Sequence, residues 1–200
     1  MKAAERIHES YVVSRRVRVL ARHLAGLLPP EADLLDVGCG DGLLARELLR
    51  QRPGMRIRGV DVRVREPSAI PAEVFDGLSL PFPDARFDAV ILVDVLHHAD
   101  DPVRLLRESA RVTRGLILVK DHAADRPFAV PTLRFMDRVG NARHGVPVPG
   151  RYWRRQTWLD RFREVGLSVS LWKDDLGLYP IPAAWIFGGS LQFLARVSAA

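Results

Sequence analysis

The chain has 200 residues, which is the size of one large domain. Hydrophobic residues make up 48% of it and charged residues 27%, a composition that excludes disordered and collagen-like chains. Its single cysteine, Cys39, cannot form an intrachain disulfide or a structural zinc site alone, so we expect a reducing, cytoplasmic location. Charges recur too regularly in residues 1–22 for a signal peptide, so we do not expect export.

The charge balance favours an acidic partner without identifying one. Lys and Arg number 30 against 24 Asp and Glu, a formal net charge of +6, and almost all the positive charge is arginine. No run exceeds two arginines, so we interpret them as spread over solvated faces and do not expect a nucleic acid partner.

Residues 176–195 contain no charged side chain and meet the length criterion for a membrane span. Pro180, Pro182 and the pair Gly188 and Gly189 divide this window into shorter pieces. We therefore predict a loop followed by a core strand at 190–197, and no membrane span.

Short apolar runs alternate with helical patterns up to residue 120, as is typical of a parallel α/β sheet. An opening helix is predicted at 7–28, ending before Pro29. Strands are then expected at 34–37, 56–60, up to residue 75, 88–93 and 116–119, with helices at 43–51 and 102–112.

Beyond Lys120 the pattern changes. Helices are predicted at 132–139 and 156–165, and strands at 167–172 and 190–197. We expect one domain made of a helical cap (1–30), a cofactor-binding core (31–120), a lid or substrate segment (121–166) and C-terminal strands (167–200). The Gly- and Pro-rich segment 140–150 is expected to act as a lid.

The sequence Asp36-Val37-Gly38-Cys39-Gly40-Asp41-Gly42 lies where the first strand meets its helix. Glycines there let the backbone approach a ligand and expose N–H donors. The spacing is G-x-G-x-G and not the dinucleotide G-x-G-x-x-G, because Leu43 follows Gly42. Asp61 ends the second strand, where a carboxylate can accept hydrogen bonds from both ribose hydroxyls. A nucleoside-like ligand is therefore predicted.

The chain resembles class I S-adenosylmethionine-dependent methyltransferases, in the small-molecule group that includes ubiquinone and menaquinone biosynthesis enzymes. The resemblance covers most of residues 10–120 and is carried by LLDVGCGDG (34–42), GVDV (59–62), FDGLSLPFPDARFDAVILVDVLHH (75–98) and LILVKDH (116–122). It implies a Rossmann-like α/β sandwich with helices on both faces. The implied sheet has seven mostly parallel strands in the order 3-2-1-4-5-7-6, with the cofactor over their carboxyl ends.

The resemblance assigns Gly38, Gly40 and Gly42 to the methionine and ribose side of S-adenosylmethionine. Asp36 is implied to orient this turn, and Asp61 to bind the ribose. The product would be S-adenosylhomocysteine, and no metal is required.

Three further positions are implied cofactor ligands. Asp76 and the Gly77 N–H match the pair that reads adenine, and Asp94 falls near the methionine amine and the sulfonium. Tyr11 and Arg16 on the opening helix are weaker candidates for the cofactor carboxylate.

These residues have structural alternatives. The aspartates could cap turns, and Asp94 could cap a helix at 95–99. Cys39 is interpreted as a small packed residue and not as a nucleophile. Where many relatives have a Lys-Pro-Gly-Gly turn, this chain has the shorter Val112-Thr113-Arg114-Gly115, so a relative's substrate should not be assumed.

Methyl transfer from a sulfonium is an in-line displacement that needs alignment and exclusion of water. For an oxygen nucleophile, a neutral histidine is a suitable base, and His97, His98 and His122 follow the fourth and fifth strands. A structural role for them stays open. Asp121 and His122 are adjacent on an extended segment and should point to opposite faces, so only one should face the cavity.

The acceptor pocket is expected to include the opening helix, the loop after Lys120 and residues 134–158. The last segment holds Asn141, His144, Tyr152, Trp153 and Trp158, which favour a flat or apolar acceptor or form the core of a lid. Arg151, Arg154 and Arg155 are interpreted as solvated, with binding of a substrate anion as the alternative.

The resulting hypothesis is a methyltransferase that acts on an O, N or C atom of a small molecule. An RNA or tRNA methyltransferase and a non-catalytic S-adenosylmethionine-binding protein remain alternatives. Whether the chain forms a homodimer is left open.

Overall fold

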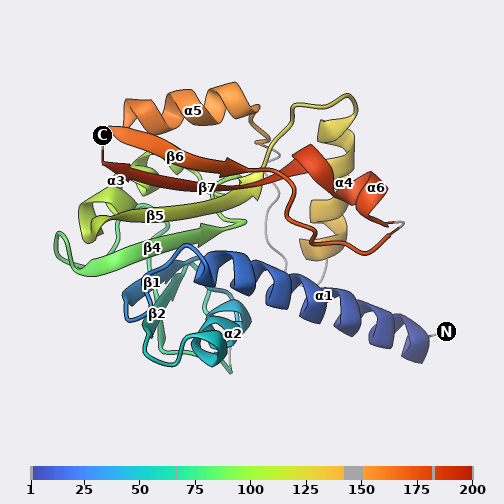
Figure 1. The fold of residues 1–200 in the computed structure, drawn as a ribbon, viewed down its shortest axis with the longest axis horizontal. Coiled ribbons are helices and arrows are strands. Elements are labelled where there is room, and N and C mark those ends of the chain that lie inside the picture. Colours follow the sequence, from blue (N-terminus) through green and yellow to red (C-terminus); the bar gives the residue numbers. More distant parts are fainter. Residues whose placement is uncertain (1, 66, 142–150, 182, 200) are drawn as a thin grey trace.

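A computed structural model describes residues 2–65, 67–141, 151–181 and 183–199, and within them the side chains of residues 14–139 and those beyond 150. One seven-stranded sheet with helices on both faces forms the fold (Figure 1). The strands are β1 (Asp33–Val37), β2 (Arg56–Asp61), β3 (Ala72–Val74), β4 (Phe87–Val93), β5 (Thr113–His122), β6 (Leu167–Lys173) and β7 (Gln192–Ala199).

The strand order is β3-β2-β1-β4-β5-β7-β6, as the resemblance implied. Strands β1 to β5 pair in parallel, and β7 is antiparallel to both β5 and β6. The central strand β4 ends in a continuous apolar run, Ala89 to Val93, as is typical of a strand covered by helices on both faces. The order reverses between β1 and β4, which creates the crevice where ligands of such sheets bind.

The helices are α1 (Lys2–Ala25), α2 (Leu43–Gln51), α3 (Pro102–Val112), α4 (Ala129–Asn141), α5 (Arg155–Glu164) and the short α6 (Ala183–Phe187), followed by a 3-10 turn, η1 (Gly189–Leu191). Leu24 of α1 and Leu48 of α2 are buried in the core on one face of the sheet. Leu105 of α3 and Phe162 of α5 are buried in the core on the other face. Helices α4 and α6 lie beyond the carboxyl ends of β4 and β5 (Figure 1).

Strand β5 is longer than the predicted 116–119. At its start α3 passes directly into the strand, so Val112-Thr113-Arg114-Gly115 is not a turn, and Thr113 pairs with Phe87. At its end Lys120 pairs with Leu194 of β7, and His122 with Gln192. A search for apolar runs misses this end because its three residues are polar, although all three are buried.

Other boundaries shift by a few residues, and one helix was missed. Helix α6 lies within the stretch expected to be a loop, just after Pro180. None of the helices in the described ranges has the length and apolarity needed to cross a membrane. Residues 140 and 141 end α4, and the remainder of the proposed lid segment, 142–150, lies outside the described residues.

We predict that Trp158→Ala lowers the free energy of unfolding by about 3–5 kcal/mol. Trp158 is 1% exposed, packs against Phe162 and Phe193, and donates from Nε1 to the His122 carbonyl at 2.9 Å. Urea denaturation measures the change. The matched control Trp185→Ala removes a side chain that is 74% exposed and should stay within about 0.5 kcal/mol of wild type. Equal losses in both variants would contradict this assignment of the core.

Candidate functional site

The turn after β1 holds three glycines in the left-handed region, Gly38 (φ 75°), Gly40 (φ 58°) and Gly42 (φ 71°). Side chains are strained in this conformation. Space is short as well, because a Cβ on Gly38 would lie 2.3 Å from a methyl group of Val95. The turn is held by the N–H groups of Gly38 and Cys39, which both donate to the Val60 carbonyl, at 2.7 and 3.1 Å.

Asp61, at the end of β2, fixes this turn from the neighbouring strand. Its Oδ2 accepts from the Gly40 N–H at 2.8 Å, and its Oδ1 accepts from the Arg63 N–H at 2.9 Å. Asp36, near the end of β1, is 2% exposed, and burial together with the charge of Asp61 raises its pKa to about 7. The two carboxylates thus lie in different environments, one buried in the sheet and one half-buried at its edge.

Cys39 is a packed residue, as interpreted from the sequence. A Cβ on Gly59 of β2 would lie 2.5 Å from its Sγ, so only glycine at position 59 leaves room for the thiol. Burial is the main cause that raises the pKa of Cys39 to about 12, which leaves it as an unreactive thiol. Arg65, which the sequence analysis did not single out, comes close to the same turn, 3.7 Å from where a Cβ on Gly40 would be.

Asp76 and Gly77 follow β3 in an exposed turn. Asp76 Oδ1 accepts from the N–H groups of Leu78 and Ser79 at 2.8 and 2.7 Å, and these bonds lower its pKa. Gly77 has φ 79°. Asp76 therefore shapes its own turn through Oδ1, which accepts both hydrogen bonds, and its Oδ2 takes part in neither.

Asp94 lies just after β4 in the left-handed region, with φ 56°. Its Oδ1 contacts the Lys120 ammonium, and its Oδ2 lies 2.6 Å from the Arg16 guanidinium. Burial raises its pKa, but Lys120 and Arg16 outweigh burial and hold the pKa far below its ordinary value. The alternative of a helix cap is wrong, because residues 95–99 form turns and the carboxylate binds two cations instead.

Lys120 is fully buried on β5, next to β4. Burial lowers its pKa, and the Asp94 carboxylate opposes that shift. The second cation that pairs with Asp94, Arg16, comes from α1 and is one-third exposed. Asp94 therefore connects β4, β5 and α1 at the carboxyl end of the sheet.

His97 is 3% exposed and lies beside the end of β5. Its Nδ1 is 2.6 Å from Asp121 Oδ1, while Asp121 also accepts from the backbone N–H groups of Leu96, His97 and His122. Burial lowers the pKa of His97, but Asp121 outweighs burial and raises it. His97 is thus oriented by a carboxylate that the backbone itself holds in place.

Asp137 of α4 lies against His97 and His122. It is 6% exposed, and its Oδ2 contacts the Tyr152 hydroxyl. His97 Nε2 lies 3.6 Å from the same Oδ2, and His122 Nε2 lies 3.6 Å from Oδ1. The sequence analysis missed Asp137, although a signal existed, because it shares a helix face with the buried Leu133 four residues earlier.

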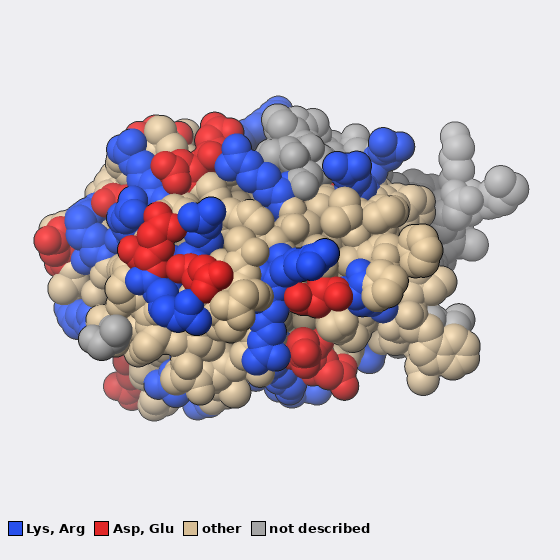
Figure 2. Space-filling view, turned by 90° about the horizontal axis from the view of Figure 1, so that it is seen from above, with Lys and Arg blue, Asp and Glu red and all other residues tan. Residues whose placement is uncertain are grey.

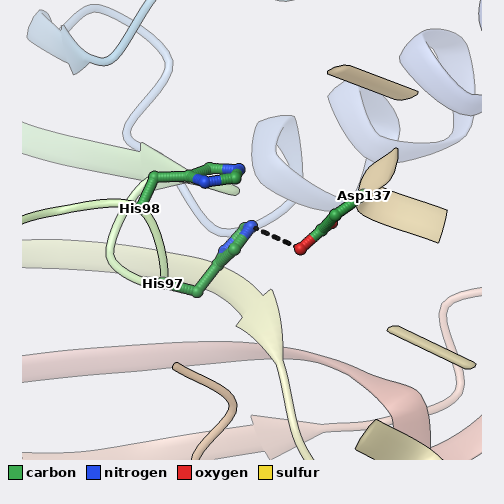
Figure 3. A group of neighbouring side chains, drawn as sticks. All are labelled: His97, His98 and Asp137. Atoms are coloured by element: carbon green, nitrogen blue, oxygen red, sulfur yellow. Dashed lines mark ion pairs between the residues drawn. The ribbon is translucent and has the colours of Figure 1, made fainter. Parts of the chain in front are cut away.

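His98 is half-buried, and its ring lies 3.9 Å from that of His97 (Figure 3). Burial and the neighbouring His97 lower its pKa. Each of the three histidines has a buried ring nitrogen without a hydrogen-bond partner among the described residues, namely His97 Nε2, His98 Nδ1 and His122 Nδ1.

The residues predicted from the sequence form two groups at the carboxyl edge of the sheet. The glycine turn and Asp61 lie at β1 and β2, with Asp76 and Gly77 after β3. Asp94 and the histidines form the second group, at β4 and β5. Asp121 and His122 point to opposite faces as expected, since Asp121 binds the turn at 96–97 and His122 faces Asp94.

Several residues proposed for the acceptor pocket have structural roles. Trp158 is a core residue, and Trp153 packs on it with ring centres 4.7 Å apart. Arg151 donates to the Asp100 carbonyl, and Arg155 lies over the Trp172 ring. Of the predicted aromatic side chains, Tyr152 reaches the histidine cluster. The side chains of Tyr11, Asn141 and His144 lie outside the described residues.

Comparisons with known proteins identify the family of the chain. The chain belongs to a methyltransferase domain family, whose model matches residues 8–171. It is 31% identical over 121 residues to the 27-O-demethylrifamycin SV methyltransferase of Amycolatopsis mediterranei, covering 53% of this chain and 44% of that one. It is 32% identical over 106 residues to the 2-methyl-6-phytyl-1,4-hydroquinone methyltransferase of Synechocystis, covering 47% of this chain and 33% of that one.

Each of these matches thus spans less than half of the relative's length. Among solved structures, a Thermotoga maritima protein described as a SAM-dependent methyltransferase, possibly a histamine N-methyltransferase, matches with a TM-score of 0.65 and 19% identity. That match covers 98% of this chain and 96% of the other. At this identity, it shows the fold.

We predict that Asp94→Asn destabilises the chain by about 3 kcal/mol, near the lower end for a broken buried pair, because Asp94 keeps some exposure. The variant leaves the buried Lys120 ammonium without its counter-charge. Adding Lys120→Met should recover part of the loss, and urea denaturation of all three proteins gives the coupling.

Asp160→Asn is the matched control, because its surface pair with Arg163 should contribute under about 1 kcal/mol. Asp94→Asn that is as stable as wild type would contradict the pair's structural role.

Proposed function

We propose that this protein is an S-adenosylmethionine-dependent methyltransferase that acts on a small molecule. The observation that carries the proposal is the turn of Gly38, Gly40 and Gly42, anchored on the Asp61 carboxylate at the reversal of strand order between β1 and β4. When bound, S-adenosylmethionine supplies a methyl group on a sulfonium.

The residues present fit this cofactor. Asp61 spends one hydrogen bond per oxygen on the backbone and is half-buried, so each oxygen keeps acceptor capacity for a ribose hydroxyl. Asp76 likewise has an oxygen outside its turn for the adenine amino group, and the Gly77 N–H is its proposed companion. Asp36 is proposed to set the position of the turn from within β1.

The methionine end of the cofactor is proposed to lie by Asp94. This carboxylate stays ionised, because Lys120 and Arg16 hold its pKa low, and it can therefore attract an amine or a sulfonium. Arg16 uses one of its nitrogens on Asp94 and is one-third exposed, so it keeps donors for the cofactor carboxylate.

The cluster of His97, His98 and His122 is proposed to activate the acceptor. Its members lie at the ends of β4 and β5, next to Asp94, and each has an unpartnered ring nitrogen among the described residues. His98 is the half-buried member and so the one nearest to solvent. Asp121 acts as a positioning residue that orients His97.

A small-molecule acceptor is supported by the two relatives described above, whose names denote a rifamycin and a hydroquinone as acceptors. Nucleic acid binding is not favoured, because many arginines already pair with carboxylates, among them Arg56, Arg111 and Arg114. Figure 2 shows positive and negative side chains interspersed on one face of the molecule. We place the protein in the cytoplasm because its one thiol is free.

Asp61→Asn should weaken binding of S-adenosylmethionine and S-adenosylhomocysteine by about 10- to 100-fold, because a charged acceptor of the ribose hydroxyls is lost. Calorimetry of the purified chain measures both ligands. Asp160→Asn, on the surface of α5, should bind as wild type does. No binding by the wild-type chain would overturn the proposal and leave a non-catalytic protein.

His98→Ala should lower the turnover number by about 100-fold or more while the affinity for S-adenosylmethionine changes less than about twofold. The acceptor is first found by screening phenols, amines and enols for transfer of a radiolabelled methyl group. His23→Ala is the control, because His23 lies on α1 against the Leu176 carbonyl. Full turnover in His98→Ala would remove His98 from the acceptor site.

A further inference from the structure

His97, His98 and Asp137 converge from two separate parts of the chain, the turn after β4 and helix α4 (Figure 3). One ligand atom from each lies within 4.8 Å of the others. The gap from His97 Nε2 to Asp137 Oδ2 is 3.6 Å, too long for a hydrogen bond. A tetrahedral metal with bonds of about 2.0–2.1 Å holds its ligands about 3.4 Å apart, so this gap matches one edge of such a site.

The imidazoles at this point are buried without partners. The His97 side chain is 2% exposed, and its Nε2 has no hydrogen-bond partner among the described residues. His98 Nδ1 is buried and unpartnered in the same sense. A buried polar atom left unpaired is unfavourable, so two of them on rings whose centres are 3.9 Å apart indicate a missing ligand.

Asp121 gives His97 the arrangement of a metal ligand. The bond from His97 Nδ1 to Asp121 Oδ1, at 2.6 Å, places the ring proton on Nδ1 and directs the Nε2 lone pair towards Asp137. Metal-binding histidines usually donate their other N–H to a carboxylate or carbonyl in this way. The backbone bonds that Asp121 accepts fix its own position.

The charges of the cluster leave room for a cation. Asp94 pairs with Lys120 and Arg16, and Asp121 is satisfied by His97 and the backbone. Asp137 is 6% exposed, yet among the described side chains no Lys or Arg lies within 4.0 Å of it. The Tyr152 hydroxyl donates a hydrogen bond to it and carries no positive charge, and the Nε2 atoms of His97 and His122 each lie 3.6 Å from one of its oxygens. A cation between Asp137 and the two imidazoles would supply the missing charge.

We infer that His97, His98 and Asp137 bind one divalent metal ion of the zinc class. Two imidazoles and one carboxylate suit Zn²⁺, Fe²⁺ or Co²⁺, whereas Mg²⁺ and Ca²⁺ prefer oxygen ligands. Three protein ligands leave a position open, as in catalytic and not structural zinc sites.

The open position identifies the class of acceptor. A metal of this class binds an oxygen atom and lowers the pKa of a hydroxyl held there. The acceptor is therefore a hydroxyl compound such as a phenol or an enol, and this part of the inference rests on the proposed function.

The experiment titrates the tag-free chain with Co²⁺ as a spectroscopic probe of the zinc class. We expect one equivalent to bind, with visible absorption of a four- or five-coordinate site, and Zn²⁺ to abolish that absorption. His98→Ala and Asp137→Asn should each lose the signal, and Asp121→Asn should weaken binding by about 10- to 100-fold. His23→Ala, a histidine outside the cluster, should keep it.

Circular dichroism and urea denaturation test whether each variant is folded. If His98→Ala does not fold, the conservative His98→Gln replaces it. The metal site is overturned if wild type gives no saturable signal, or if folded His98 and Asp137 variants bind Co²⁺ as wild type does. Binding of S-adenosylmethionine is measured separately, so loss of metal binding with intact cofactor binding rejects this inference alone. Transfer of a methyl group to amines but not to hydroxyl compounds would reject the acceptor class.

Discussion

The ion pair between Asp94 and Lys120 is the interaction on which the site depends. Lys120 is fully buried, and a buried ammonium requires a counter-charge. Asp94 supplies it from the neighbouring strand and also binds Arg16 of α1, so β4, β5 and the first helix are tied together at one point. That point lies at the carboxyl edge of the sheet, where the chain leaves β4 for the turn that carries His97 and His98. The same pair therefore stabilises the fold and fixes the start of the turn that carries His97 and His98.

The two groups of polar residues along this edge are built differently. Around β1 and β2 the site is made mostly of backbone, because glycines remove side chains and Asp61 accepts a hydrogen bond from the Gly40 N–H. Around β4 and β5 the site is made of polar side chains, and most of these side chains are buried. Helix α4 follows β5 after a short loop and completes this second group through Asp137.

The sheet and the glycine turn could be predicted because they depend on local signals. Apolar runs mark the central strands, and the glycines with Asp61 mark the turn after β1 at fixed distances along the chain. The cofactor role of these residues stays a prediction. The end of β5 could not be predicted, since Lys120, Asp121 and His122 are polar and are strand because they pair with β7, and Lys120 also with β4. Tyr152 and Asp137 are 15 residues apart, and their contact depends on how α4 packs, which no local pattern encodes. The roles proposed for the histidines likewise depend on neighbours contributed by tertiary structure.

Cys39 gives this chain an internal reporter. The thiol is enclosed between its own turn and Gly59, and burial holds its pKa far above neutrality, so alkylating reagents reach it when the turn separates from β2. Because the chain has no other cysteine, the rate of alkylation measures how often the glycine turn opens in the native protein. A ligand held by that turn would slow the reaction in proportion to its occupancy, and no label would have to be introduced to observe it.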